Sequence, residues 1–136
     1  MRKPEDMTHP SVLLVDDDVG MVETLGDILA TSRYQVATTD SGEAAVARVQ
    51  ADRFDAVLMD IKMPGLNGVQ ALRAIKFLAP EIPVIMMTAY TRDELIAEAQ
   101  QTTGFPVLVK PLDLDRVLAI LSQIAPAPPE RRQGAP

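Results

Sequence analysis

Four short apolar runs in this chain each end in a polar residue, and this pattern constrains the fold more than any other feature. The runs are 12–15, 56–59, 84–87 and 107–109, and the residues that follow them are Asp16, Asp60, Thr88 and Lys110. Unbroken apolar runs are typical of parallel strands that are buried on both faces. Because the carboxyl ends of such strands meet at one edge of an open sheet, the sequence predicts that acidic side chains, a hydroxyl and an ammonium lie close together.

Between these runs, apolar residues repeat with the spacing of one face of an α-helix. The five stripes consist of Val22, Leu25, Ile28, Leu29; Ala45, Val46, Val49; Val69, Leu72, Ile75, Ala79; Leu95, Ile96, Ala99; and Leu114, Val117, Leu118, Leu121. Side chains that can cap the start of a helix precede three of these stripes, namely Asp18, Asp40 with Ser41, and Asp113. Pro80 closes the third stripe, and the fourth helix is expected over 92–101.

Strands are predicted at 12–16, 35–38, 56–60, 84–88 and 107–109, which gives a (βα)5 chain. Short right-handed connections favour an α/β fold with a doubly wound parallel sheet. Residues 1–10 are polar and read as a flexible lead, whereas 126–136 hold four of the 11 prolines and read as a tail or linker. The folded domain is therefore expected over 11–125.

Composition excludes several classes of protein. The chain has no cysteine, so a disulfide framework and a thiolate zinc site are excluded and a cytoplasmic setting is expected. Its net charge of −6 argues against an extended nucleic-acid surface. His9 is the only histidine, so the folded part offers no histidine cluster or phosphocarrier. The apolar runs are too short to span a membrane, and no secretory signal opens the chain.

The chain resembles the receiver domain of bacterial two-component response regulators over about residues 11–124. The matching pieces are Val15-Asp16-Asp17, Met59-Asp60, Met63-Pro64-Gly65, Gly68, Thr88-Ala89 and Lys110-Pro111, in the order and with the separations of the family. Each piece alone is common, but together they are specific. The resemblance implies a flavodoxin-like sheet with strand order 2-1-3-4-5, dependence on Mg²⁺, and phosphorylation of Asp60 by a histidine kinase or a histidine phosphotransfer protein.

The acidic residues also point to a metal on chemical grounds. Asp16, Asp17 and Asp60 would share one pocket, and like charges so close are disfavoured without a cation. Mg²⁺ prefers oxygen ligands and keeps several waters. We expect Asp17 and Asp60 to be carboxylate ligands, the backbone carbonyl of Lys62 to be a third, and Asp16 to act mainly through water.

Asp60 would then be the phosphoacceptor, with Thr88 and Lys110 contacting phosphoryl oxygens. Lys62 and Tyr90, two places after Asp60 and Thr88, are expected to tune the lifetime of the acyl phosphate. By the resemblance, Thr88 also belongs to a conformational switch whose second member is an aromatic residue; here that position is Val107, a departure from the family. The Lys110–Pro111 bond is expected to be cis, as in the family.

The resemblance further implies how this domain acts on partners. We expect it to catalyse only its own aspartyl phosphorylation and dephosphorylation, and so not to be an enzyme in the usual sense. A downstream protein or output domain would dock on the face of the fourth helix, fifth strand and fifth helix, where Arg92, Leu95, Val107 and Arg116 are candidates. A phosphorylation-dependent dimer is possible, with no direct nucleic-acid or membrane binding.

Two other functions fit parts of the sequence. A haloacid-dehalogenase-like phosphatase would use Asp16 as its nucleophile, but Gly20 replaces the expected Thr or Val, no paired acidic motif follows Lys110, and Asp60 is left without a role. A receiver-like interaction module that takes no phosphate is the second alternative. The complete acidic pocket with Thr88 and Lys110 argues against it.

Overall fold

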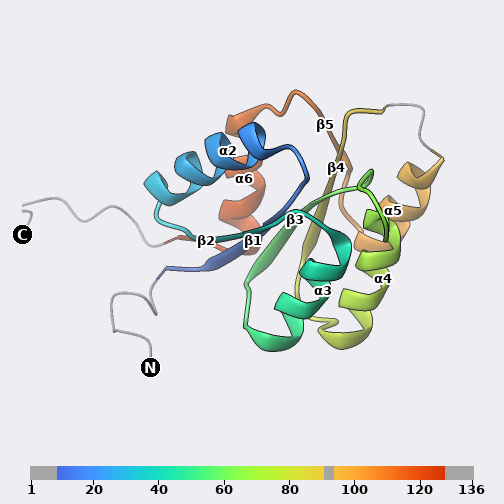
Figure 1. Ribbon diagram of the computed structural model, residues 1–136. Helices are drawn as coiled ribbons and strands as arrows, with labels where there is room; N and C mark the ends of the chain where they lie inside the picture. The colour runs from blue at the N-terminus through green and yellow to red at the C-terminus, as the bar shows by residue number, and fades with distance from the viewer. Residues whose placement is uncertain (1–8, 91–93, 128–136) are drawn as a thin grey trace, which may run out of the picture.

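The five strands form one parallel sheet. The computed structural model describes residues 9–90 and 94–127, and its strands are β1 (Ser11–Val15), β2 (Gln35–Thr39), β3 (Ala56–Asp60), β4 (Val84–Thr88) and β5 (Leu108–Val109). Their order across the sheet is β2-β1-β3-β4-β5, and all neighbouring pairs are parallel (Figure 1). The predicted flavodoxin-like fold and strand order are therefore confirmed.

The five described helices are α2 (Val19–Thr31), α3 (Gly42–Ala51), α4 (Gly68–Leu78), α5 (Leu95–Thr103) and α6 (Leu114–Ile124). Four of the five begin at a capping side chain, and α5 begins after Glu94 without one. The side chains of Asp18, Ser41 and Asp113 each accept a backbone N–H from the first turn of the following helix. In residues 9–90 and 94–127, no helix has the length and apolar composition needed to cross a bilayer.

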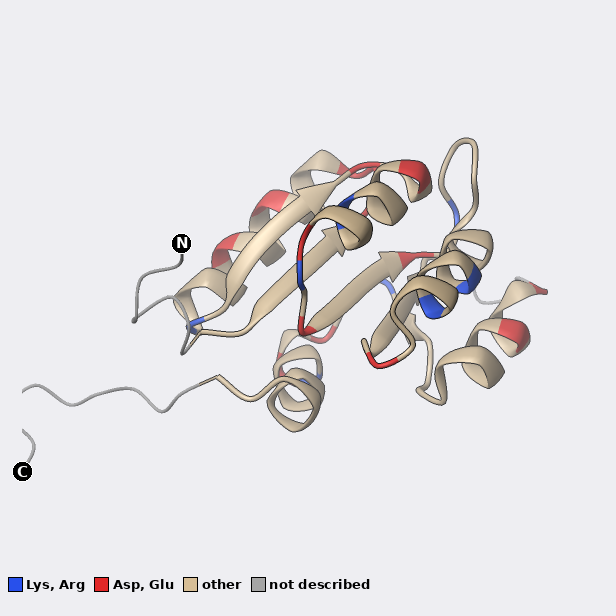
Figure 2. Cartoon of the chain, turned by 90° about the horizontal axis from the view of Figure 1, so that it is seen from below, with Lys and Arg blue, Asp and Glu red and all other residues tan. Residues whose placement is uncertain are grey.

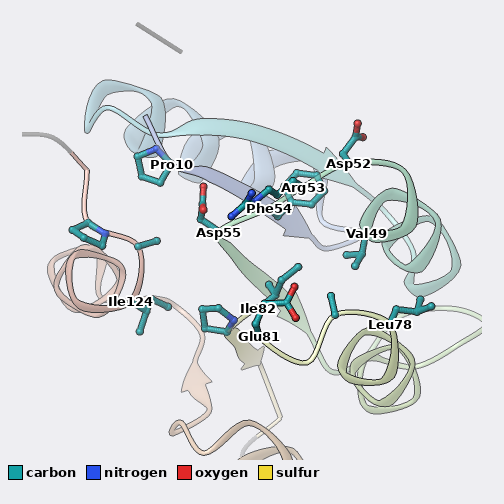
Figure 3. Close-up of a pocket in the computed structure, with 14 residues that line it drawn as sticks. Pro10, Val49, Asp52, Arg53, Phe54, Asp55, Leu78, Glu81, Ile82 and Ile124 are labelled. Carbon is teal, nitrogen blue, oxygen red and sulfur yellow. The ribbon is translucent and has the colours of Figure 1, made fainter. Parts of the chain in front are cut away.

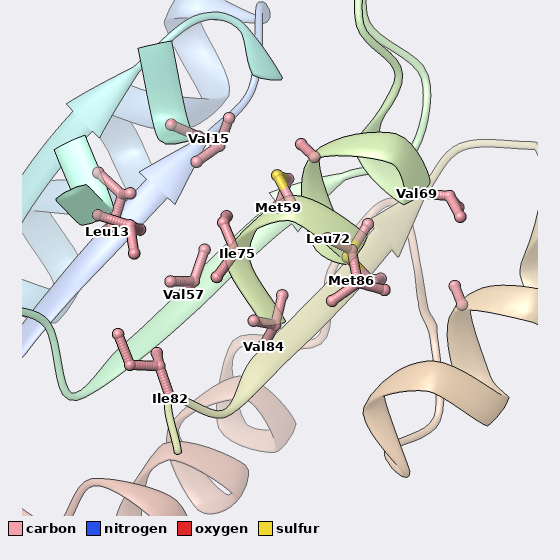
Figure 4. Close-up of a cluster of buried hydrophobic side chains, with 14 of the residues drawn as sticks. Leu13, Val15, Val57, Met59, Val69, Leu72, Ile75, Ile82, Val84 and Met86 are labelled. Carbon is pink, nitrogen blue, oxygen red and sulfur yellow. The ribbon is translucent and has the colours of Figure 1, made fainter. Parts of the chain in front are cut away.

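The two faces of the sheet are covered by different helices, as Figure 1 shows. On one face, Leu72 and Ile75 of α4 lie over the strands (Figure 4). Val49 of α3 and Ala99 of α5 belong to the same cluster. On the other face, α2 and α6 cover the strands, with Leu29 and Leu121 fully buried. Each such buried side chain contributes about 1.5–3 kcal/mol of stability, so both faces fix the edge where the strands end.

Four predicted elements differ in their bounds from the structure. β2 ends at Thr39, one residue later than predicted. β1 begins one residue earlier than predicted and ends at Val15, which leaves Asp16 in the turn that follows. β5 has only two residues because Pro106, which has no N–H, precedes it and Val107 instead donates its N–H to Gln100. The fourth helix extends to Thr103 and ends at Gly104, whose φ is 75°; its predicted start at residues 92 and 93 lies outside the described residues.

Candidate functional site

The acidic residues predicted to meet do lie together. Asp16 and Asp17 follow β1, and Asp60 ends β3, the neighbouring strand, in a register that pairs Val15 with Met59. One carboxylate oxygen from each of these three acids lies within 4.8 Å of the other two. Acidic residues are seen at the arrowhead ends of the strands in Figure 2. Asp16 and Asp60 are buried and Asp17 is exposed, so the cluster opens to solvent on one side.

Lys110 supplies the positive charge of this cluster. Its Nζ donates to Oδ2 of Asp16 at 2.5 Å and to Oδ2 of Asp60 at 3.2 Å. The backbone N–H of Lys110 donates to the carbonyl oxygen of Thr88, which fixes the end of β5 beside the end of β4. The Lys110–Pro111 bond is cis. The ammonium thus lies between two buried carboxylates that come from different strands.

Burial and charge set the protonation of Asp60. Burial, followed by repulsion from Asp16, raises the pKa of Asp60 from 3.8 to about 6, although Lys110 and a hydrogen bond from the N–H of Lys62 act in the opposite direction. Burial alone would lower the pKa of the Lys110 ammonium, but its hydrogen bond to Asp16 and the attraction of both carboxylates raise it overall. The metal-free site therefore holds more negative charge than one lysine offsets.

We expect the raised pKa of Asp60 to make the metal-free domain less stable as the pH rises. The unfolded chain releases this proton near pH 3.8 and the folded protein near pH 6, so stability is lost between these values. Replacing Asp60 by asparagine removes the buried charge. A shift of about two pKa units corresponds to about 3 kcal/mol, and screening by solvent at the open side of the cluster reduces this, so we expect D60N to stabilise the metal-free protein by about 2 kcal/mol at pH 8. Below about pH 4 the difference should vanish.

Urea unfolding with a chelator present, followed by circular dichroism at several pH values, measures this effect. D27N removes an exposed carboxylate from α2 and serves as the matched control. The difference in unfolding free energy between D27N and the original protein should not rise with pH as it does for D60N. A D60N protein less stable than the original at pH 8 would show that the Asp60 charge is stabilising in the folded state.

The donor atoms of the site suit a hard divalent cation. Three carboxylates converge, and all the ligand atoms they offer are oxygens. The exposure of Asp17 leaves room for water, which Mg²⁺ retains when it binds to proteins. The carboxylate of Asp16 contacts Lys110 directly and accepts the N–H of Asp18. The arrangement therefore fits the predicted Mg²⁺ on the chemistry of its donors.

The loop from Asp60 to α4 is shaped by close backbone contacts. The N–H of Ile61 donates to Met87, and the carbonyl of Ile61 accepts the N–H of Gly68. α4 then begins with a capping box in which Asn67 and Gln70 each accept the other's backbone N–H. The Asn-x-x-Gln spacing is a sequence signal for this cap, which the apolar stripe of the helix does not reveal. The side chain of Lys62 is exposed on this loop.

The proposed tuning and switch residues lie in different environments. Thr88 is fully buried, and its Oγ1 accepts the N–H of Tyr90 at 3.0 Å. Tyr90 itself is 60% exposed, beside the site. Val107 is buried in the cluster under α5, so it does not contribute an exposed side chain to a partner face. Val109 and Arg116 are exposed there, and Arg92 lies outside the described residues.

A cavity of about 800 Å³ lies at the opposite edge of the sheet (Figure 3). Phe54 and Asp55 before β3, Ile82 before β4, and Ile124 at the end of α6 are among the residues that line it. None of the predicted site residues lines this cavity. The candidate site is therefore the acidic edge formed by the carboxyl ends of the strands.

Comparison with known sequences identifies the family. The model of the response regulator receiver domain matches residues 12–122. The transcriptional regulatory protein ZraR of Escherichia coli K12 is 40% identical over 119 residues, which cover 86% of this chain and 27% of ZraR. The sporulation initiation phosphotransferase F of Bacillus subtilis is 31% identical, with 88% of this chain and 97% of that protein covered. The chain thus spans about a quarter of one relative and nearly all of the other.

Solved structures agree with this result. The receiver domain of the sensor histidine kinase PA1611 from Pseudomonas aeruginosa, with a magnesium ion in its active-site cleft, has a TM-score of 0.78 and 27% identity, over 85% of this chain and 97% of that one. The chemotaxis protein CheY4 of Vibrio cholerae has a TM-score of 0.77 and 28% identity, over 85% of this chain and 98% of that one. The chain belongs to the family of response regulator receiver domains, which act in two-component signal transduction.

Proposed function

We propose that Asp60 accepts a phosphoryl group from a phosphohistidine of a sensor kinase or a histidine phosphotransfer protein. The observation that carries this proposal is the position of Asp60. The residue is 5% exposed, and its carboxylate lies in a cluster with Asp16 and Asp17, 3.2 Å from the Lys110 ammonium. A positioned carboxylate can act as a nucleophile toward phosphorus. The similarity to a sporulation phosphotransferase over almost its whole length supports the same chemistry.

Asp17, Asp60 and the backbone carbonyl of Lys62 are the groups that would hold Mg²⁺, with Asp16 acting mainly through water. When bound, the ion would offset negative charge on the phosphoryl oxygens. The convergent carboxylate oxygens support this assignment. A magnesium ion in the cleft of the PA1611 receiver domain supports it by similarity.

The transfer is balanced by groups on both proteins. A carboxylate oxygen of Asp60 forms a bond to phosphorus as the phosphorus–nitrogen bond of phosphohistidine breaks, and the imidazole keeps the bonding electron pair and takes up a proton. Lys110 stays protonated, since its pKa is raised, and its charge stabilises the equatorial oxygens of the transition state. Water later attacks phosphorus and releases phosphate and the Asp60 carboxylate, so this chain catalyses only changes in its own phosphorylation.

Lys62 and Tyr90 are proposed to set how long the phosphoryl group persists. Both side chains are exposed and both lie two residues after a site residue. Such positions allow them to limit the approach of the in-line water. The signal would pass to a downstream partner on the face formed by α5, β5 and α6, where Val109 and Arg116 are exposed, and a phosphorylation-dependent dimer would use the same face.

Thr88 is proposed to convert phosphorylation into a change of conformation. Its buried hydroxyl oxygen accepts the N–H of Tyr90 in the unphosphorylated protein. In the phosphorylated protein the hydroxyl would rotate and donate to a phosphoryl oxygen. We expect T88A to be phosphorylated at a rate within about tenfold of the original, since one neutral hydrogen bond contributes about 1 kcal/mol. The phosphorylation-dependent NMR shifts of Ala89 and Tyr90 should be largely lost, and T88S should restore them. Unchanged shifts in T88A would exclude this role.

Beryllofluoride titration tests whether the site takes a phosphoryl group. With Mg²⁺ present, NMR shifts should concentrate around residues 60, 88 and 110, and D60N should abolish both these shifts and labelling by acetyl phosphate. An absence of shifts and of labelling in the original protein would favour the interaction module that takes no phosphate. Labelling that survives in D60N would move the acceptor to another residue.

A further inference from the structure

The loop that follows Asp60 contacts a glutamate of α3 that has no place in the proposed chemistry. The N–H of Leu66 donates to both carboxylate oxygens of Glu43, at 3.4 Å each. Gly65, with φ of 77°, leaves the space that Glu43 occupies, because Oε2 lies 2.8 Å from where a Cβ would stand. Gly42 approaches the same loop, and a Cβ there would lie 2.7 Å from the Leu66 carbonyl oxygen. Two glycines thus let α3 and the loop meet closely.

The other end of the same loop reaches the site. The N–H of Lys62 donates to the Asp60 carboxylate, and Ile61 is tied to both Met87 and Gly68 by backbone hydrogen bonds. Leu66 is four residues from Lys62, whose carbonyl is a proposed ligand. The Glu43 contact therefore restrains the far end of a short segment, residues 61–67, beside the start of α4, and the first residues of the same segment border the acidic cluster.

We propose that Glu43 is a positioning residue that sets the affinity of the site for Mg²⁺ by fixing the loop that carries Lys62. This inference rests on the proposed function, since it takes the Lys62 carbonyl as a ligand. Groups that orient metal ligands are themselves important, and their loss typically weakens metal binding about 10–100-fold. Glu43 is exposed and its contacts are long, so we expect about a tenfold effect.

Three variants separate positioning from the charge of Glu43. E43A removes both the acceptor and the charge, whereas E43Q keeps an oxygen that can accept the Leu66 N–H. E23A removes a comparable exposed carboxylate from α2, where Glu23 borders the hollow next to Asp16 and does not contact the loop. Calorimetric titration with Mg²⁺ alone gives the affinity, and amide hydrogen exchange of Leu66 in the metal-free protein reports on the loop.

In E43A we expect Mg²⁺ to bind about tenfold more weakly and the Leu66 amide to exchange faster. Labelling by acetyl phosphate should be slower at low Mg²⁺ and return to the original rate at saturating Mg²⁺. E43Q should keep most of the affinity, and E23A should change it less than about twofold because an exposed charge is screened.

Two results would overturn this inference. One is an unchanged Mg²⁺ affinity in E43A. The other is an equal loss of Mg²⁺ affinity in E43Q and E43A, which would assign the effect to charge alone. If E43A does not fold, E43Q still tests the inference, since E43Q is expected to keep most of the affinity. Failure of the original protein to bind Mg²⁺ or take up phosphate would instead contradict the proposed function.

Discussion

Replacing Lys110 by alanine is expected to slow phosphorylation of Asp60 by about a hundredfold at saturating Mg²⁺. Loss of one group that stabilises developing negative charge typically costs about 10²–10³ in rate. Lys110 has this position, since its ammonium lies 3.2 Å from Asp60 and only 16% of its side chain is exposed. In K110A, Asp16 and Asp60 also lose their shared cation, so the metal-free protein should lose stability at neutral pH.

The rate is measured by intact-protein mass spectrometry after mixing with acetyl phosphate, at a temperature well below the unfolding transition of each variant. K76A is the matched control, because Lys76 is partly buried and donates to the Ile82 carbonyl, away from the site. K76A should be labelled at the original rate. A K110A rate within threefold of the original would exclude Lys110 from the transfer step.

A second large effect is expected from adding one methyl group at Gly68. A Cβ at this position would lie 2.2 Å from the carbonyl oxygen of Asp60 and 2.8 Å from Cα of Ile61. Both are backbone atoms at the end of β3, so neither can move aside without shifting the strand or α4. We expect G68A to lower the free energy of unfolding by about 3 kcal/mol, the upper end of the usual range for overpacking, and to displace Asp60.

Urea unfolding measures this loss, and G20A is its control. Gly20 lies in α2, where the nearest atom to a Cβ is 3.7 Å away, so alanine there should be neutral or stabilise by up to about 1 kcal/mol. A G68A protein as stable as the original would mean that α4 can move away from β3 at little cost. The contact would then not fix the geometry around Asp60.

The positions of the strands and the meeting of acidic residues at one edge could be predicted from local patterns in the sequence, whereas the strand order was implied by the resemblance to the receiver family. The apolar runs gave β3 and β4 with the observed bounds, 56–60 and 84–88. Parallel strands bring their carboxyl ends together, which placed Asp16, Asp60 and Lys110 at one edge.

The contacts that depend on tertiary packing could not be predicted from local patterns in the sequence. The hydrogen bonds that the Leu66 N–H donates to Glu43 link residues 23 positions apart, and no periodic pattern signals them. The direct contact between Lys110 and Asp16 follows from the exact ends of β1 and β5, and strand ends are where hydrophobic patterns are least precise. The burial of Val107 likewise results from packing under α5.

The position of the phosphoryl group tests the account most directly. The protein is labelled with acetyl phosphate and Mg²⁺, the acyl phosphate is trapped chemically, and the modified residue is identified by peptide mass spectrometry. We expect the label on Asp60 alone, and none when a chelator removes Mg²⁺. Label on Asp16 would indicate a phosphatase-like nucleophile instead, and would contradict the assignment of Asp60 as the acceptor.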